Sequence, residues 1–220
     1  MGNDSDFWPR AGDTLFLSGS GDMAAMLDGS WDRAHAYICG YKEAGDILVE
    51  HVRANGSPPD TLVFPIGFNY RQCLELHLKL SIGLCQRYLG ATMNIPKEHK
   101  LHALWNELKP LLSRISDEWC EDVDIDAEHA IDACMAEFAK HDSTSQGFRY
   151  WRDAKGGETL STLHSIDLDN LQHIVTKIDG FLSGIVDWLD DREHVKNDYE
   201  ADMASLMPKE SDFISLSDFV

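Results

Sequence analysis

The stretch "NYRQCLELHLKLSIGLCQRYL", residues 69 to 89, decides the fold of this 220-residue chain. Leucine, isoleucine, tyrosine and cysteine recur here at helical spacing and leave few gaps, which is typical of a helix that is buried on most of its surface. We expect this helix to begin after Pro65 and Gly67 and to end before Gly90, because proline and glycine interrupt helices. The stretch therefore predicts a mostly buried helix.

Four further segments carry apolar residues at helical spacing. Ser30 and Asp167 are suitable N-terminal caps for two of them, and Pro110 should kink or divide another. Because the connections are short, neighbouring helices should run in opposite directions. The sequence predicts a mainly α fold, an antiparallel bundle of about five long helices, with the four additional helices near residues 30–54, 97–119, 126–140 and 167–191.

The segments outside these helices predict a small β-hairpin and short strand-like ends. Residues 1–29 contain the strand-like run "DTLFLS" and are expected to form a leader that packs on the domain. Aromatic residues followed by a Gly-Gly turn suggest a hairpin at 147–163, inside a domain that spans 30–192. Residues 193–220 are expected to form an acidic tail with a strand-like end.

The chain is strongly acidic, with 38 acidic and 19 basic residues and a formal charge of −19. This charge repels nucleic acid phosphates, so an RNA site would have to be a local basic patch. The alternatives are a basic partner protein, or a charge that only keeps the protein soluble. The sequence contains no apolar run of membrane-spanning length and no signal peptide, so we expect no membrane contact and a cytoplasmic location. The five cysteines are expected to be reduced and mostly buried.

Two residue pairs in the opening stretch could carry chemistry. Glu75 and Lys79 are four residues apart, so their side chains project from the same side of a helix, either as an ordinary ion pair or as part of a polar cleft. Arg71 and His77 are separated by about 120° around an ideal helix and do not share a face. They could cooperate in RNA cleavage only if the helix start is irregular, with histidine moving a proton and arginine stabilising phosphate charge. Otherwise they are a core-edge histidine and a solvated arginine.

Three other groups of residues invite a functional interpretation. His99 and His102 could face one metal ion but lack a third ligand, so we expect neither a metal ion nor a cofactor. The acidic run "DEWCEDVDIDAE", residues 117 to 128, is best interpreted as a solvated turn between helices. Arg149 lies in the aromatic segment "FRYW", where it could receive a phosphate and stack on a base, or clamp the segment against acidic helices.

The motifs "YRQCLELHLKLSIGLCQRYLG" and "HKLHALWNELKPLL" resemble those of the helical HEPN superfamily. Its members often carry a Glu-Leu-x-Leu-Lys helix, followed by a helix that opens with His-x-Leu-x-x-Leu. The resemblance covers about residues 30 to 190. The positions that match these motifs are Glu75, Lys79, His99, Leu101 and Leu104.

The resemblance implies several functions for a bacterial protein of this kind. Many HEPN proteins are metal-independent ribonucleases in toxin–antitoxin or phage-defence systems, with an arginine, four to six further residues and a histidine. Arg71 and His77 fit that spacing as catalytic residues, and Glu75, Lys79, His99 and Arg149 would then shape a ligand-binding cleft. Other members are non-catalytic partners, which here could dock on a basic toxin or nucleic-acid-binding subunit, or modules that bind nucleotide-like ligands. Many form homodimers, and whether this chain is an enzyme stays open.

Overall fold

The structure is a computed structural model that describes residues 8–9, 11–27, 32–121 and 124–206. The chain divides into two compact units, Met1–Asp32 and Arg33–Val220. The described residues of the first unit form turns and bends, and the strand expected at "DTLFLS" is not formed. The expectation that this leader packs on the domain stays a prediction.

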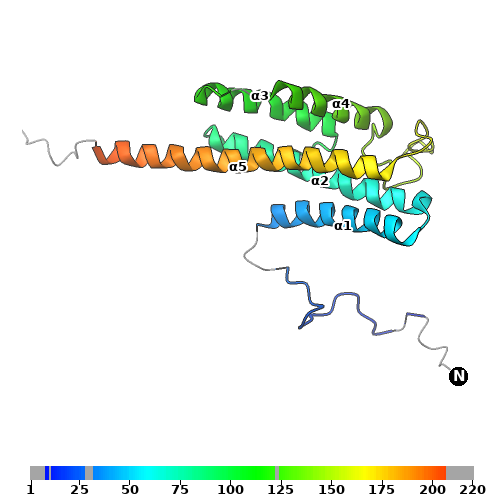
Figure 1. The fold of residues 1–220 in the computed structure, drawn as a ribbon. Coiled ribbons are helices and arrows are strands. Elements are labelled where there is room, and N and C mark those ends of the chain that lie inside the picture. Colours follow the sequence, from blue (N-terminus) through cyan, green and yellow to red (C-terminus); the bar gives the residue numbers. More distant parts are fainter. Residues whose placement is uncertain (1–7, 10, 28–31, 122–123, 207–220) are drawn as a thin grey trace, which may run out of the picture. The chain divides into compact units, whose positions relative to one another are not determined.

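The second unit is a helical bundle, which confirms the mainly α prediction. Helix α2 packs against α1, α3 and α5, and α4 packs against α3. Figure 1 shows α2 and α5 between α1 on one side and the α3–α4 pair on the other. The described residues of this unit contain five helices, α1 (Arg33–Asn55), α2 (Pro59–Tyr88), α3 (Leu101–Trp119), α4 (Ile125–His141) and α5 (Leu168–Leu206).

Helix α2 is the central element because its apolar residues leave no polar face wide enough for solvent. Leu74, Leu78 and Ile82 are fully buried among the neighbouring helices. Burying each of these side chains stabilises the fold by about 1.5–3 kcal/mol. The opening stretch of sequence therefore forms the core, as its pattern predicts.

The start of α2 differs from the prediction, since the helix begins at Pro59 and continues through Pro65 and Gly67. Pro59 occupies the first turn, where a backbone N–H is not needed. Pro65 removes one intrahelical hydrogen bond. Full burial of Ile66, with Leu62 packed against the core, offsets that loss and keeps the segment helical.

The other helix ends are largely where the sequence places them. Helix α3 begins at Leu101 rather than near residue 97, because the Glu98 carboxylate accepts hydrogen bonds from the backbone N–H groups of His99 and Lys100. Pro110 lies within α3 and does not divide it. The expected cap Ser30 lies outside the described residues.

Helix α5 continues to Leu206, well beyond the predicted end near Asp191, so that residues 193–206 of the expected tail are helical. The added segment contains neither glycine nor proline, and the next proline in the sequence is Pro208. Figure 1 shows this end of α5 projecting past the other helices. None of the described helices is both long enough and apolar enough to cross a membrane.

The hairpin expected at 147–163 does not form in the described residues, which make turns and one isolated bridge between Arg152 and Glu158. Phe148 packs against Gly67 of α2 so closely that an added Cβ there would lie 2.3 Å from its ring. Leu160 has a left-handed backbone with φ of 53°. This left-handed residue interrupts the extended backbone that a hairpin strand requires.

The five cysteines are free, and they differ in exposure. Cys73 and Cys85 of α2 are fully buried, whereas Cys39 and Cys120 are exposed, so the expectation that most are buried is only partly met. Burial raises the pKa of the Cys85 thiol to about 12. The two buried thiols are therefore protonated at neutral pH.

Candidate functional site

A cluster of buried charges surrounds Glu75 on α2. Its Oε1 accepts a hydrogen bond from Lys79 Nζ at 2.9 Å, and its Oε2 accepts one from Arg71 Nη1 at 2.9 Å. His99 Nδ1 lies 2.8 Å from Oε1. Arg71, Glu75 and Lys79 follow one another at four-residue intervals, so a regular helix places all three side chains on one side.

Arg71 uses every edge of its guanidinium group within the protein. Besides Glu75, its Nε lies 3.2 Å from Oδ2 of Asp142, and its Nη2 donates to the backbone carbonyl of His99. Its exposed fraction is only 4%. A phosphate could therefore reach this guanidinium only after displacing protein partners.

The turn after α4 delivers Asp142 to this cluster. Asp142 Oδ1 accepts hydrogen bonds from the backbone N–H groups of Gln146 at 2.9 Å and Gly147 at 2.8 Å. Ser145 Oγ donates to the carbonyl of His99 at 3.0 Å, beside Arg71. We name Arg71, Glu75, Lys79, His99 and Asp142 the ionic cluster, and it ties α2 to the start of α3 and the end of α4.

The ionic cluster balances two buried cations against two buried carboxylates. Burial alone would raise the pKa of Glu75, but hydrogen bonds from Lys79, His99 and Arg71 outweigh it, so its pKa lies below the ordinary value. The carboxylate is charged at neutral pH. Removing one partner from such a cluster leaves an uncompensated buried charge, which is far more costly than losing a surface ion pair.

His77 contacts α5, whereas Arg71 contacts Glu75 of its own helix and Asp142 at the end of α4. Its Nδ1 lies 3.1 Å from Oδ1 of Asp179 on α5, and the same oxygen is 3.5 Å from Cys73 Sγ. Burial would raise the pKa of Asp179, but the bond to His77 prevails and lowers it. His77 is 5% exposed. The two expected catalytic residues thus bind different carboxylates, as their angle on an ideal helix predicts.

Arg149, the fourth expected ligand-binding residue, has aromatic partners of its own. Its guanidinium carbon lies 5.7 Å from the ring centre of Phe68 and 5.3 Å from that of Tyr150. The side chain is exposed. Arg149 therefore stacks on aromatic rings of its own chain, and it forms no ion pair with an acidic helix among the described residues.

The two histidines considered for metal binding have other neighbours. His99 contacts Glu75, and His102 lies within 3.3 Å of the side-chain nitrogen of Asn106 on the next turn of α3. Over the described parts of the chain, no group of three or more histidine, cysteine, aspartate or glutamate side chains is arranged to hold a metal ion.

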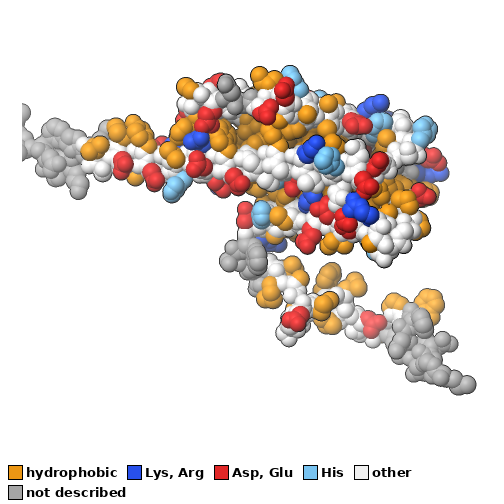
Figure 2. Space-filling view, in the orientation of Figure 1, with side chains coloured by type: hydrophobic (Ala, Val, Ile, Leu, Met, Phe, Trp, Pro, Cys, Tyr) orange, Lys and Arg blue, Asp and Glu red, His pale blue; other side chains and the backbone are white. Residues whose placement is uncertain are grey.

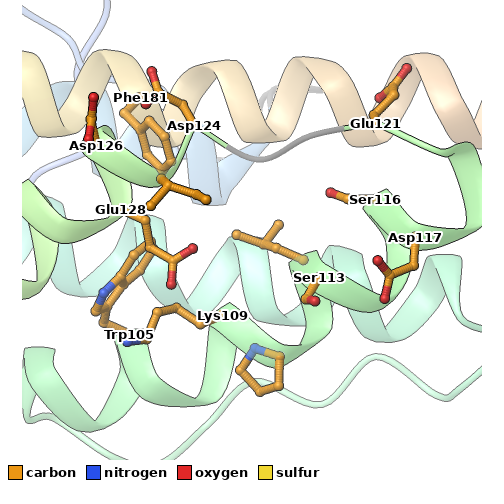
Figure 3. Close-up of a pocket in the computed structure, with 13 residues that line it drawn as sticks. Trp105, Lys109, Ser113, Ser116, Asp117, Glu121, Asp124, Asp126, Glu128 and Phe181 are labelled. Atoms are coloured by element: carbon orange, nitrogen blue, oxygen red, sulfur yellow. The ribbon is translucent and has the colours of Figure 1, made fainter.

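A groove that the sequence did not predict lies between α3, α4 and α5 (Figure 3). It has a volume of about 830 Å³. Trp105, Leu112 and Phe181 line its apolar floor, and its acidic rim is formed by Asp117, Glu121, Asp124, Asp126 and Glu128. We name this hollow the acidic groove. Seven carboxylates without a basic residue in "DEWCEDVDIDAE" were the one signal in the sequence that pointed to it.

A smaller hollow of about 410 Å³ continues the acidic groove along α5. The two hollows share four lining residues from α3, α5 and the connection after α3, namely Leu112, Ser116, Glu121 and Phe181. The second hollow adds Gly180, Gly184 and Trp188 of α5. Figure 2 shows hydrophobic side chains gathered in this region between α3 and α5.

No protein-family model, curated protein or solved structure matches this chain. The HEPN resemblance therefore rests on the quoted motifs alone.

Proposed function

We propose that this chain is a HEPN-like helical protein that acts by binding a basic protein partner, without cleaving RNA itself. The observation that carries the proposal is the state of Arg71 and His77. Each is almost completely buried, and each is held by a carboxylate on a different side of α2. Acid–base cleavage of RNA requires both groups at one accessible phosphate.

The charge of the protein supports a basic partner over RNA. The formal charge of −19 repels phosphates and attracts cationic surfaces. Arg149, the arginine expected to receive a phosphate, lies on aromatic rings of the protein. Association with a basic partner would be accelerated by this charge and weakened by salt.

The remaining functional expectations stay predictions. Binding of a nucleotide-like ligand would draw on Lys79 and Arg149 together, whereas Lys79 binds Glu75 and Arg149 stacks on Phe68 and Tyr150. Three further expectations also stay predictions. They are homodimer formation, a cytoplasmic location and a role in bacterial toxin–antitoxin or phage-defence systems.

Expression of the chain alone tests the proposal. Growth of a bacterial host and the integrity of its total RNA should be unchanged, and purified protein should leave RNA intact without added metal ions. RNA cleavage by the parent chain that disappears in Arg71→Ala and His77→Ala, but persists in Arg114→Ala and His129→Ala, would overturn it. Arg114 and His129 are exposed, so their variants control for the loss of any arginine or histidine.

A further inference from the structure

The floor of the acidic groove is apolar. Trp105 of α3 and Phe181 of α5 pack edge to face there with ring centres 6.2 Å apart, and Phe181 is the half-buried ring of the two. Gly180 and Gly184 add no side chains, and a Cβ placed on either glycine would meet nothing within 4 Å. Another chain could therefore approach the α5 backbone closely along this side.

Where the helix projects beyond the bundle, the same side of α5 carries exposed apolar side chains interleaved with Asp191, Asp198 and Asp202. At 100° per residue, Val195, Tyr199 and Leu206 fall within about 60° of Gly184 and Trp188 around the helix axis. All three side chains are exposed, Tyr199 with 65% of its surface. From Gly184 to Leu206 this apolar strip is about 33 Å long, at 1.5 Å per residue.

The rim of the groove carries one carboxylate that is paired, Glu121 with Arg192, and several that are not paired among the described residues. In the part of the chain that the structure describes, Asp117, Asp126 and Glu128 form no ion pair. The groove's lysine, Lys109, is held by Asp132 at 2.7 Å. An apolar floor beside unpaired carboxylates suits a segment that is apolar on one face and basic on the other.

Charge decides among the segments that could cover this surface. A second copy of the chain would bring a further charge of −19. The last ten residues, "SDFISLSDFV", are apolar but contain two aspartates and no basic residue. Both are repelled by the rim, whereas a basic segment of another protein is attracted to it.

We propose that the acidic groove and the apolar strip that continues it along α5 bind a basic amphipathic helix of a separate protein. A helix suits the site better than a strand, because the walls are helices and offer apolar side chains at helical spacing rather than an open backbone edge. This proposal rests on the proposed function, since it gives the basic partner a place on the bundle and a chemistry.

A designed peptide tests the surface directly. The probe is a labelled helix of about 22 residues, long enough to span the strip, with leucine on one face and lysine elsewhere. Its counterpart has glutamate in place of every lysine. Fluorescence anisotropy with the full chain should show binding of the basic peptide that weakens with salt, and at least tenfold weaker binding of the acidic one.

Gly184→Leu is the variant that separates binding from folding. The added side chain enters open space and replaces a helix-destabilising glycine, so the melting temperature should stay the same or rise. Affinity for the basic peptide should fall at least tenfold because the floor is filled. Unchanged affinity in this variant would overturn the proposal.

A matched pair of charge variants separates the groove from the overall charge. Asp117→Asn/Asp126→Asn/Glu128→Gln should weaken binding at least tenfold at low salt. Glu43→Gln/Glu107→Gln/Glu200→Gln removes the same charge from exposed positions that do not line the groove, and should leave affinity nearly unchanged. Equal losses in the two triple variants would contradict a site in the groove.

The outcomes distinguish this site from the proposed function. If the affinity for the basic peptide is the same in every groove variant, the proposed site is wrong, but the proposal of a basic partner still stands. RNA cleavage that depends on Arg71 and His77 would overturn the proposed function. A dimer in sedimentation experiments that Gly184→Leu dissociates would overturn the separate partner, because a second copy would then occupy the groove.

Discussion

The ionic cluster and the acidic groove lie on the same bundle, and they treat their carboxylates in opposite ways. Glu75 is buried and bonded to Arg71, Lys79 and His99, whereas Glu128 lies on the groove rim without an ion pair among the described residues. A buried, fully paired charge fixes how helices meet. A charge beside an open apolar floor has attraction left for another molecule. This contrast is why we propose that the first region stabilises the fold and that the second binds a partner.

The largest test of this contrast removes one carboxylate from each region. Glu75→Gln leaves Arg71 and Lys79 buried without their shared charge, so the free energy of unfolding should fall by about 3–5 kcal/mol. Glu128→Gln should change it by no more than about 0.5 kcal/mol. Urea unfolding measures both values. Similar losses in the two variants would erase the distinction between the regions.

Two glycines make the same comparison through packing. At Gly67 a Cβ would lie 2.3 Å from the ring of Phe148, so Gly67→Ala should destabilise the fold by about 1–3 kcal/mol through overpacking. At Gly184 the space is open, and Gly184→Ala should stabilise α5 by about 0.5–1 kcal/mol. Thermal unfolding of both variants checks the opposite signs. A loss at Gly184 would mean that the groove is filled in the folded chain.

The pH dependence of stability should come from the paired carboxylates. The pKa values of Glu75 and Asp179 are lowered in the folded protein, so the unfolded chain binds more protons in acid. Their contribution is complete above about pH 5 and is lost as pH falls through the folded-state pKa values, by at most about 1.4 kcal/mol per pH unit for each proton.

Variants show whether the acid sensitivity comes from these two carboxylates. Glu75→Gln should flatten the fall in unfolding free energy between about pH 5 and pH 3, relative to the parent chain. Asp179→Asn removes the other carboxylate whose pKa is lowered and should flatten the same fall. Urea titrations at each pH provide the measurement, and the parent slope in both variants would contradict this source of acid sensitivity.

The smallest effect concerns Asp124, a rim residue that also caps α4. Its carboxylate accepts a hydrogen bond from the backbone N–H of Ala127 at 3.0 Å. Asp124→Ala should therefore cost about 1 kcal/mol, and Asp124→Asn much less, because asparagine also caps helices. Melting temperatures would show the difference. An equal cost for both variants would mean that charge, rather than capping, matters at this position.

The sequence predicted the parts of the molecule that depend on local spacing. Glu75 and Lys79 meet at 2.9 Å because residues four apart share a helix face, and Arg71 and His77 diverge for the same geometric reason. The predicted start of α2 was wrong because burial of Ile66 outweighs the tendency of Pro65 to interrupt a helix. Local sequence gives the intrinsic helix propensity of a segment, and tertiary packing can override that propensity.

The parts that the sequence missed join residues far apart in the chain. Asp142 reaches Arg71 only because the turn after α4 folds back on α2, and no periodicity relates the two positions. The rim of the acidic groove was visible as a run of acids, but its floor was not, since Trp105 and Phe181 come from separate helices. A site of this kind exists only once the helices are packed.

The two buried thiols of α2 can report how often the core of the protein opens, because a reagent reaches them only after opening. Cys85 is fully buried, and its raised pKa of about 12 keeps it unreactive while α2 stays in place. Cys39 and Cys120, which are exposed, should react with an alkylating reagent at once. Cys85 should be modified slowly, and only when the core opens. The rate of its modification therefore measures the opening of the native bundle without any denaturant.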